Sequence, residues 1–282
     1  MSPPAPPAAA EIEAQVAAAL AEDIGSGDVS AQLVADRPAA ARLVCREPAV
    51  LAGAAWFEAC FRALDPAVRV DWRFADGDAL PGGDAEVCRV HGRSRALLSA
   101  ERCALNFLQT LSATATATRR HVDAVAGSGC RILDTRKTLP GLRLAQKYAV
   151  RCGGGDNHRI GLFDAVMLKE NHIHAAGSIA AAMQAARVQF PTLPLIVEVE
   201  SLDELEQVLA ADGATRVLLD DFSLPMLREA VQRSRGRVPL EVSGGVGLEQ
   251  LAAIAATGVD CISIGGLTKH VRAVDFSLRM VG

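Results

Sequence analysis

Four cationic residues and one histidine follow, or lie between, two short apolar runs in the second half of the chain. They are Arg136, Lys137, His158, Arg159 and Lys169. Arginine can bind a carboxylate through two parallel hydrogen bonds, so this group suits a planar substrate that carries acid groups. A single surface Arg or Lys is more often a solvated charge. We predict that Arg136, Lys137 and Lys169 lie at the ends of neighbouring strands. The gathering of these cations in a chain with a formal net charge of −4 favours the binding of an anionic ligand.

Acidic residues end the next two apolar runs along the chain. Glu198 lies in "PLIVEVE" (194–200), and Asp220 lies at the end of "RVLLDD" (216–221). Two carboxylates that converge near phosphate groups suit Mg²⁺, which proteins hold with oxygen ligands and retained waters. The same acids could instead cap helices or pair with neighbouring cations. The residues alone leave both interpretations open.

Glycine pairs end the last two apolar runs. Ser243, Gly244 and Gly245 end one run, and Gly265 and Gly266 end the other. Because glycine has no side chain, its backbone N–H group can approach an anion closely at the start of a following helix. One such pair is weak support, since glycine also simply ends strands. Two in succession predict a phosphate-binding site.

A polar stripe runs along an apolar segment nearer the N-terminus. Arg102, Asn106 and Gln109 are spaced by four and three residues, which places them on one side of a helix. The residues of another, apolar side are Ala104, Leu108 and Leu111. The polar stripe could be exposed to solvent, or it could reach across a contact between subunits.

Neither the histidines nor the cysteines form a transition-metal motif. His172 and His174 would make a poor zinc site without a third ligand. The seven cysteines are scattered, odd in number and without a CxxC pair, which argues against a disulfide framework or a zinc ribbon. We expect small buried thiols in a reducing cytoplasm.

Composition excludes several classes of protein. The chain lacks the basic excess that is typical of nucleic-acid binding. No apolar run reaches the length of about 18 residues that a transmembrane helix needs, so we expect no membrane partner. The start, "MSPPAPPAAA", has no Lys or Arg and is not a signal peptide. Residues 1–10 are rich in Pro and Ala and predict a disordered tail.

Alternating strands and helices must position these residues. From Arg131 onward, apolar runs alternate with amphipathic stretches of helical length. The predicted strands are 131–137, 165–172, 194–200, 216–221, 238–245 and 261–266, and the predicted helices are 142–151, 178–190, 201–212, 224–234 and 247–258. This pattern indicates parallel strands that bind a ligand beyond their carboxyl ends. The segment is shorter than a complete eightfold barrel, which takes about 250 residues. We therefore expect a reduced or open α/β barrel, with a doubly wound sheet as the alternative.

The first part of the chain has a different pattern. Residues 11–23 predict a helix, and a long helix is predicted from about Ser99. The predicted strands are 41–53, 68–74 and 85–92. This arrangement predicts an α+β domain that leads into the barrel through the long helix.

At these residues the chain resembles the quinolinate phosphoribosyltransferases (nicotinate-nucleotide pyrophosphorylase, carboxylating). The matching text comprises "EDIGSGDVS", "ERCALNFLQTLS", "DTRKTLPGLRLAQKYAVRCGGGDNHRIGLFDAVMLKENH", "IVEVE", "LLDDF", "EVSGGV" and "ISIGGLTKHVRAVDFS". The resemblance covers nearly the whole chain after the tail, and its central block is long and specific.

The resemblance implies the type II phosphoribosyltransferase fold. An N-terminal α/β sandwich would comprise residues 11–112 plus 268–282, and a partial α/β barrel of about six to seven parallel strands would comprise residues 113–267. It also implies a cytoplasmic enzyme that converts quinolinate and phosphoribosyl pyrophosphate, with Mg²⁺, into nicotinate mononucleotide, CO₂ and pyrophosphate. The implied assembly is a homodimer with shared active sites, with a hexamer as a further possibility.

The resemblance also assigns roles to the cationic residues. Arg136, His158, Arg159 and Lys169 resemble the quinolinate pocket. Arg102 resembles an arginine that the partner subunit supplies. Lys137 and Lys169 resemble residues that contact the phosphoribosyl donor.

The remaining polar residues correspond to the donor side of the site. Glu198 and Asp220 resemble the acids that hold the ribose and the metal, and with Lys137 and Lys169 they complete the catalytic set. The residues that resemble the cradle of the 5′-phosphate are Ser243, Gly244, Gly245, Gly265 and Gly266, with His270 near it.

Three other functions remain open. A related phosphoribosyltransferase could act on nicotinate or on another pyridine or purine base, although the excess of cations favours a dicarboxylate. A barrel aldolase could use Lys169 as a Schiff-base nucleophile. A binding protein for a phosphate ligand would need the glycines and cations, but it would not explain the acids beside them.

Overall fold

The computed structural model of the chain describes residues 4–281. Within them, the chain separates into two compact units. The first unit comprises Met1–Arg119, Thr138–Gly154 and Leu267–Gly282, and the barrel unit comprises Arg120–Lys137 and Gly155–Gly266. The domain boundaries given above remain a prediction, and the units differ from them in grouping residues 138–154 with the first unit.

The first unit packs helices against an antiparallel sheet. Its helices are α1 (Ala9–Ile24), η1 (Ala31–Leu33), α2 (Ala54–Leu64), α4 (Arg143–Cys152) and most of α3 (Ser94–Ala124). Its strands are β1 (Pro38–Cys45), β2 (Ala49–Val50), β3 (Arg69–Trp72), β4 (Ala79–Leu80), β5 (Ala85–Arg93) and β12 (Phe276–Val281). The sheet has the order β12-β1-β5-β3, and β2 pairs with β4. β12 pairs antiparallel with β1, so the C-terminal strand belongs to the sheet of the first unit.

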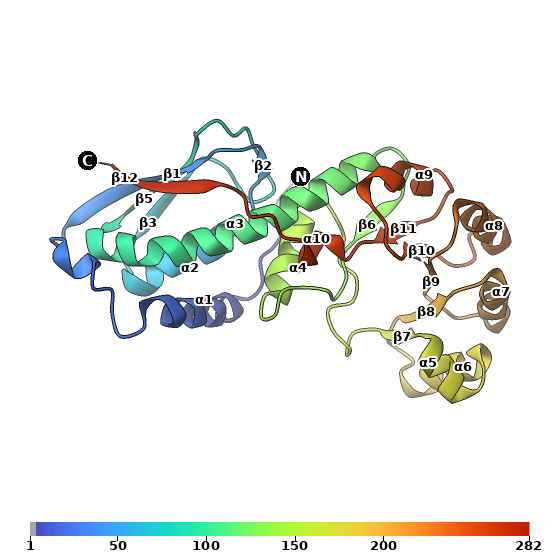
Figure 1. Cartoon of the computed structure of the whole chain (residues 1–282). Coiled ribbons are helices and arrows are strands. Elements are labelled where there is room, and N and C mark those ends of the chain that lie inside the picture. Colours follow the sequence, from blue (N-terminus) through green and yellow to red (C-terminus); the bar gives the residue numbers. More distant parts are fainter. Residues whose placement is uncertain (1–3, 282) are drawn as a thin grey trace. The chain divides into compact units, whose positions relative to one another are not determined.

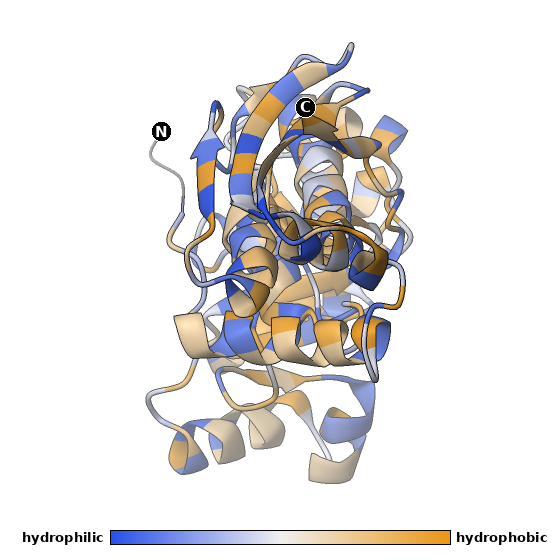
Figure 2. Ribbon diagram, turned by 90° about the vertical axis from the view of Figure 1, so that its left-hand side faces the viewer, coloured by the Kyte–Doolittle hydropathy of each residue, from blue (hydrophilic) through white to orange (hydrophobic). Residues whose placement is uncertain are grey.

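The predicted elements of this unit are present, with three differences. The predicted disordered tail lies partly outside the described residues, and α1 already begins at Ala9. The predicted strand 41–53 is split into β1 and β2 around Pro48, which has no N–H group for a sheet. Helix α2, to which the pattern assigned no element, follows directly. The alternation of hydrophobic and hydrophilic residues along the strands is visible as bands in Figure 2.

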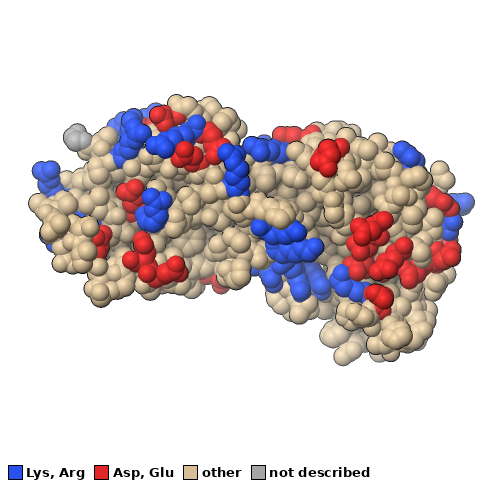
Figure 3. All heavy atoms as spheres, in the orientation of Figure 1, with Lys and Arg blue, Asp and Glu red and all other residues tan. Residues whose placement is uncertain are grey.

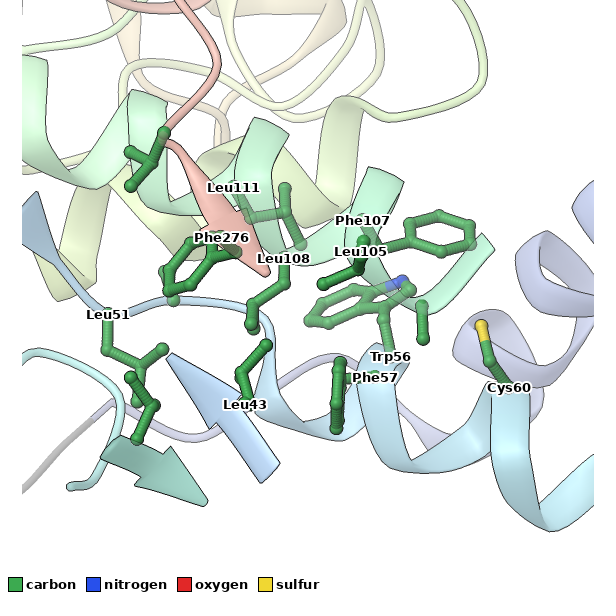
Figure 4. Packing of buried hydrophobic residues seen from close by; sticks show 14 of the residues in the cluster. Leu43, Leu51, Trp56, Phe57, Cys60, Leu105, Phe107, Leu108, Leu111 and Phe276 are labelled. Carbon is green, nitrogen blue, oxygen red and sulfur yellow. The ribbon is translucent and has the colours of Figure 1, made fainter. Parts of the chain in front are cut away.

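The core of the first unit combines aromatic residues from α2 with aliphatic residues from α3 and β1. Trp56, Phe57 and Phe61 are completely buried and belong to one cluster with Leu43 and Leu108. Figure 4 shows Trp56 and Phe57 of this cluster beside Leu43 and Leu108. The rings of Phe57 and Phe61 meet edge to face with their centroids 5.0 Å apart. These contacts make α3 a fixed support, because the apolar side predicted for it packs into this core.

All seven cysteines are buried and free, as the sequence predicts. Burial raises the pKa of the Cys60 thiol to about 12 and that of Cys103 to about 11. Because the thiolate is the reactive form, we expect Ellman's reagent to label essentially none of the thiols in the folded protein. All seven should react after denaturation in guanidinium chloride. Rapid labelling of any thiol before denaturation would contradict this burial.

The barrel unit is a single parallel sheet covered by helices. Its strands are β6 (Arg131–Leu133), β7 (Val166–Leu168), β8 (Leu195–Val199), β9 (Arg216–Asp220), β10 (Leu240–Ser243) and β11 (Cys261–Ser263). Its helices are α5 (Glu170–Ala176), α6 (Ile179–Gln189), α7 (Leu202–Ala211), α8 (Leu224–Ser234), η2 (Leu248–Gln250) and α9 (Leu251–Ala255), and α10 (Gly266–Lys269) begins at its last residue.

The strand order identifies the unit as a partial α/β barrel. The six strands follow the order β6-β11-β10-β9-β8-β7 without a reversal, and Figure 1 shows α6 to α9 together on one side of them. A doubly wound sheet would reverse its order and carry helices on both faces. Residue Asp156 extends the edge by a parallel bridge to Leu133 of β6. The predicted partial barrel is therefore confirmed.

Two predictions about this unit were wrong. The second predicted strand ends at Leu168 rather than at His172, and Glu170 to Ala176 form α5. The strand ends that carry Lys137 and Lys169 are not neighbours, because β6 and β7 lie at opposite edges of the sheet. Among residues 4–281, helix length and hydropathy nowhere reach what a membrane-spanning helix requires.

Candidate active site

The strand order places the predicted site residues side by side at the carboxyl ends of the sheet. From β6 to β7 the successive ends carry a basic segment, a glycine pair, a second glycine pair, two acidic ends and a lysine. Figure 3 shows basic side chains gathered beside a group of acidic ones on one face. The site residues of the barrel unit thus form a continuous arc, in which basic residues lie at the two ends and glycines and acids lie between them.

The register of the strands puts most of these residues on one face of the sheet. Ser243 pairs with Asp220, and Glu198 pairs with Leu218 two residues before Asp220. Paired residues in parallel strands point to the same side, and side chains alternate along a strand. Ser243, Asp220 and Glu198 therefore share one face, and the intervening apolar residues pack against the helices.

The basic segment after β6 lies over the glycines of β11. The N–H group of Lys137 donates to Thr135 Oγ1 at 3.1 Å, so the segment turns instead of continuing as a strand. A Cβ atom on Gly265 would lie 2.7 Å from Lys137 Cδ, which is too close for any side chain. The absence of a side chain at Gly265 therefore lets the Lys137 stem cross this end of β11.

The glycines after β10 adopt a conformation that other residues rarely take. Gly244 has φ of 101° and Gly245 has φ of 45°. A Cβ atom on Gly244 would lie 2.0 Å from Asp221 Oδ1, whereas one on Gly245 would meet nothing within 4 Å. Gly244 thus allows β9 and β10 to approach, and Gly245 presents its backbone to open space. This geometry suits the approach of an anion.

Lysine and acids meet at the ends of β7, β8 and β9. Lys169 Nζ forms an ion pair with Glu198 Oε2. The N–H group of Lys169 donates to His172 Nδ1 at 3.1 Å, so His172 caps α5. Burial, and then the charges of Glu198 and Asp221, raise the pKa of Asp220 above its ordinary value. The acids at β8 and β9 are therefore close enough to repel one another, and a cation would relieve that repulsion.

Two arginines lie close enough to this group and to each other for their charges to interact. Partial burial, and then the charge of Arg136, lower the pKa of Arg159. Asp164 fixes the loop that follows Arg159 by accepting from the N–H groups of Ile160 at 2.7 Å and Gly161 at 2.9 Å. Two like charges held together in a partly buried place favour a ligand with more than one negative charge.

His158 and Asp134 connect this loop to β6. Asp134 is completely buried and accepts from the N–H group of His158 at 2.8 Å and from Asn157 Nδ2 at 2.7 Å. His158 is only 7% exposed. Its Nε2 lies 3.3 Å from Glu241 Oε1. The contact of His158 with a substrate therefore remains a prediction, since its described partners are protein groups.

Arg102 and His270 belong to the first unit. Arg102 is exposed on α3, together with Asn106, and Gln109 is partly exposed. The opposite apolar face of α3 is buried as predicted. His270 follows α10 and is exposed.

The donor set fits a magnesium ion better than a transition metal. Across residues 4–281, no three His, Cys, Asp or Glu side chains are grouped so as to hold a metal ion. Mg²⁺ is commonly held by one or two carboxylates together with substrate phosphates and water. Glu198 and Asp220 repel each other, and the glycine loops lie beside them. The two carboxylates could therefore hold Mg²⁺ together with a substrate phosphate.

The sequence pattern did not identify the residues inside the barrel that form hydrogen bonds and ion pairs beneath the site. Asp134, Asn157, Arg216 and Glu241 were not assigned a role. Glu241 stands between apolar residues in "VPLEVSGG", and Arg216 begins "RVLLDD". A charged residue inside an otherwise apolar strand is a signal that could have identified Glu241, because such a residue must find a partner when it is buried.

Comparisons with known proteins agree with this geometry. Models of the N-terminal and C-terminal domains of quinolinate phosphoribosyl transferase match residues 28–112 and 114–279. The chain is 44% identical to nicotinate-nucleotide pyrophosphorylase [carboxylating] of Mycobacterium leprae, over 92% of this chain and 94% of that protein. It is 41% identical to the probable enzyme of the same name from Bacillus subtilis, over 91% and 89%.

A solved structure extends the likeness to the fold. The nicotinate-nucleotide pyrophosphorylase of Francisella tularensis superimposes with a TM-score of 0.95 and 45% identity, covering 97% of each chain. The arc of polar residues, the partial barrel and these matches over both units lead to one conclusion. The chain belongs to the quinolinate phosphoribosyltransferase family.

Proposed function

We propose that this chain transfers the phosphoribosyl group of phosphoribosyl pyrophosphate to quinolinate, with decarboxylation. The products would be nicotinate mononucleotide, pyrophosphate and CO₂, in the biosynthesis of NAD. The observation that carries the proposal is the order of the strand ends, which places Arg136, the glycine loops and the acids along one edge of the sheet, with Arg159 near enough to Arg136 for their charges to interact. Quinolinate carries two carboxylates, and phosphoribosyl pyrophosphate carries a 5′-phosphate and a pyrophosphate, so the two sides of the arc match the two substrates.

The cations would orient the pyridine nitrogen towards C1 of the ribose. Arg136 and Arg159 would bind the quinolinate carboxylates. Lys137, which crosses Gly265, would contact the phosphoribosyl donor, and the glycine loops would hold the 5′-phosphate. Positioning of this kind can remove much of the barrier of a reaction between two substrates.

The acids would act on the charge that develops as the reaction proceeds. As the bond from C1 to pyrophosphate breaks, positive charge develops on the ribose, and the carboxylates of Glu198 and Asp220 would stabilise it. The same two residues would hold Mg²⁺, which supplies charge neutralisation for the pyrophosphate when it is bound. Once the ring nitrogen is joined to ribose it is cationic, so it stabilises the electron pair that stays on the neighbouring ring carbon when CO₂ leaves. A proton from water then takes the place of the carboxylate on that carbon, and no covalent enzyme intermediate is needed.

Release of CO₂ tests the proposal directly. Quinolinate labelled in the carboxyl group next to the ring nitrogen should release label only when phosphoribosyl pyrophosphate and Mg²⁺ are both present. Nicotinate, which has no carboxylate at that position, serves as the matched substrate for the related transferase activity. Turnover of nicotinate without turnover of quinolinate would reject the proposal.

The geometry disfavours the aldolase alternative. A Schiff-base lysine must be able to lose its proton, whereas Lys169 is ion-paired with Glu198. Treatment with borohydride and a carbonyl substrate should therefore leave Lys169 unmodified. Covalent trapping at Lys169 would restore the aldolase interpretation.

We further propose a homodimer in which Arg102 completes the active site of the partner. The support is the exposed position of Arg102 on a helix whose other face is anchored in the core. Arg102→Ala and Arg136→Ala subunits should each be nearly inactive. An equal mixture of the two variants should regain about a quarter of wild-type activity, because in a random mixture half of the dimers are mixed and each has one intact site of two. Inactive mixed dimers, shown to form by mass spectrometry, would reject the sharing of sites.

A further inference from the structure

A buried carboxylate inside the barrel has no part in the chemistry proposed above. Glu241 lies in β10, two residues before Ser243, and is completely buried. Arg216 Nη1 donates to its Oε2 at 2.8 Å, and His158 Nε2 lies 3.3 Å from its Oε1. Burial by itself would raise the pKa of Glu241, but its hydrogen bonds with His158, Ser263 and Arg216 oppose burial, and the pKa is lowered. Glu241 is therefore an ionised group in the barrel interior.

The two partners of Glu241 come from different parts of the unit. Arg216 belongs to the neighbouring strand β9, in which Leu218 is the residue paired with Glu241. Arg216 thus lies on the same face of the same sheet. His158 instead belongs to the segment between α4 and β7, which joins the sheet at Asp156 by one bridge. Glu241 therefore ties this segment to the centre of the sheet.

The hydrogen bonds of His158 define the state of its ring. The N–H group of Arg159 donates to His158 Nδ1 at 2.7 Å. Because an acceptor nitrogen carries no proton, the geometry places the ring proton on Nε2, which faces Glu241. Both ring nitrogens are thus directed at protein groups. The ring joins the Glu241 carboxylate to the backbone of Arg159.

Arg159 needs such support because of its neighbour. Its guanidinium lies near that of Arg136 in a partly buried place, and like charges there tend to separate. The hydrogen bond that Arg159 Nη1 donates to the backbone oxygen of Ala165 is long, at 3.5 Å, and therefore weak. A buried ionic cluster often stabilises a fold no more than apolar side chains of the same volume would. The presence of Glu241, Arg216 and His158 in the barrel interior therefore suggests that they hold a nearby group in place.

We propose that Glu241 is a positioning residue for the pyridine-acid pocket, acting through the His158 ring on the backbone of Arg159. This inference rests on the proposed function for the identity of the ligand. It assigns His158 a supporting role and leaves the contact with the quinolinate carboxylate to Arg159.

Glu241→Gln tests the proposal with the full-length enzyme. The variant should raise the KM for quinolinate about tenfold, as for one lost charge-assisted hydrogen bond, and change the KM for phosphoribosyl pyrophosphate less than about twofold. Asp76→Asn is the matched control, because Asp76 is a buried carboxylate of the first unit that accepts from Tyr148 Oη at 2.7 Å. It should change neither KM.

Nitrogen NMR of histidine gives a second readout that a merely structural role would not move. In ¹⁵N-histidine-labelled wild-type protein, the His158 signal, assigned by its loss in His158→Gln, should show the Nε2–H tautomer at neutral pH. Glu241→Gln should alter that signal. This measurement on the wild type also decides the case in which Glu241→Gln fails to fold.

Several results would overturn the proposal. They are an unchanged KM for quinolinate in Glu241→Gln, an equal rise in both KM values, a matching rise in Asp76→Asn, and an Nδ1–H or doubly protonated His158 in the wild type. Failure of wild-type protein to release CO₂ would reject the proposed function, whereas the His158 tautomer would still report whether Glu241 fixes the ring.

Discussion

Arg136→Ala is expected to lower kcat/KM for quinolinate by about 30- to 1,000-fold, which corresponds to about 2–4 kcal/mol. The substitution removes one of the two neighbouring arginines, so a quinolinate carboxylate would lose its bidentate partner. The effect should appear mainly with quinolinate as the varied substrate. Steady-state kinetics with each substrate varied in turn measure it.

Arg131→Ala is the matched control for this variant. Arg131 begins β6, the strand that precedes Arg136. It is exposed, and its side chain forms a surface ion pair with Asp156 at 3.4 Å. Such pairs contribute little, so its loss should change kcat/KM less than about threefold. Near-normal turnover in Arg136→Ala, or equal losses in both variants, would remove Arg136 from the pocket.

Asp220→Asn is expected to lower kcat by about 100- to 1,000-fold, as for other losses of a preorganised charge near the reacting atoms. It should also raise Tm at neutral pH. The pKa of Asp220 is raised in the folded protein, which means that folding disfavours its ionised form. This unfavourable contribution is fully present above the folded pKa, and the neutral amide removes it.

The gain in Tm should vanish as the pH falls below the ordinary pKa of an aspartate, because Asp220 is then protonated in both folded and unfolded wild-type protein. Thermal unfolding of both proteins across this pH range measures the difference. Asp203→Asn, at an exposed acid in the first turn of α7, is the control and should leave kcat within about twofold. A lower Tm for Asp220→Asn at neutral pH would contradict the repulsion among the acids.

The opposite signs of these two effects would mark Asp220 as a residue kept for function. A carboxylate that pairs for stability would lose both activity and Tm when neutralised. Strain of this kind at an active site is commonly balanced by the stability of the rest of the fold. Here the apolar outer faces of the strands, packed on α6 to α9, supply that stability.

Most of the fold could be predicted from the sequence because its signals are local. Helix α8 occupies the predicted residues 224–234, since a strong apolar period and Pro225 near the start define it. The strand cores were also predicted, although their ends were not. The sequence pattern extended one predicted strand through Glu170 to His172. In the fold, α5 begins at Glu170, and the side chain of His172 caps this helix.

The sequence by itself determined the chemical types at each strand end: cations, glycines and acids in a fixed order along the chain. Only the tertiary structure decided which of them are neighbours. It placed β11 between β6 and β10, so that Lys137 lies over Gly265 rather than beside Lys169. It also brought Glu241 within reach of His158, more than 80 residues away in the chain. Such pairing depends on the order of the strands and on burial, and neither can be read from neighbouring residues in the sequence. The role of a buried charge depends on the partner that the fold places next to it.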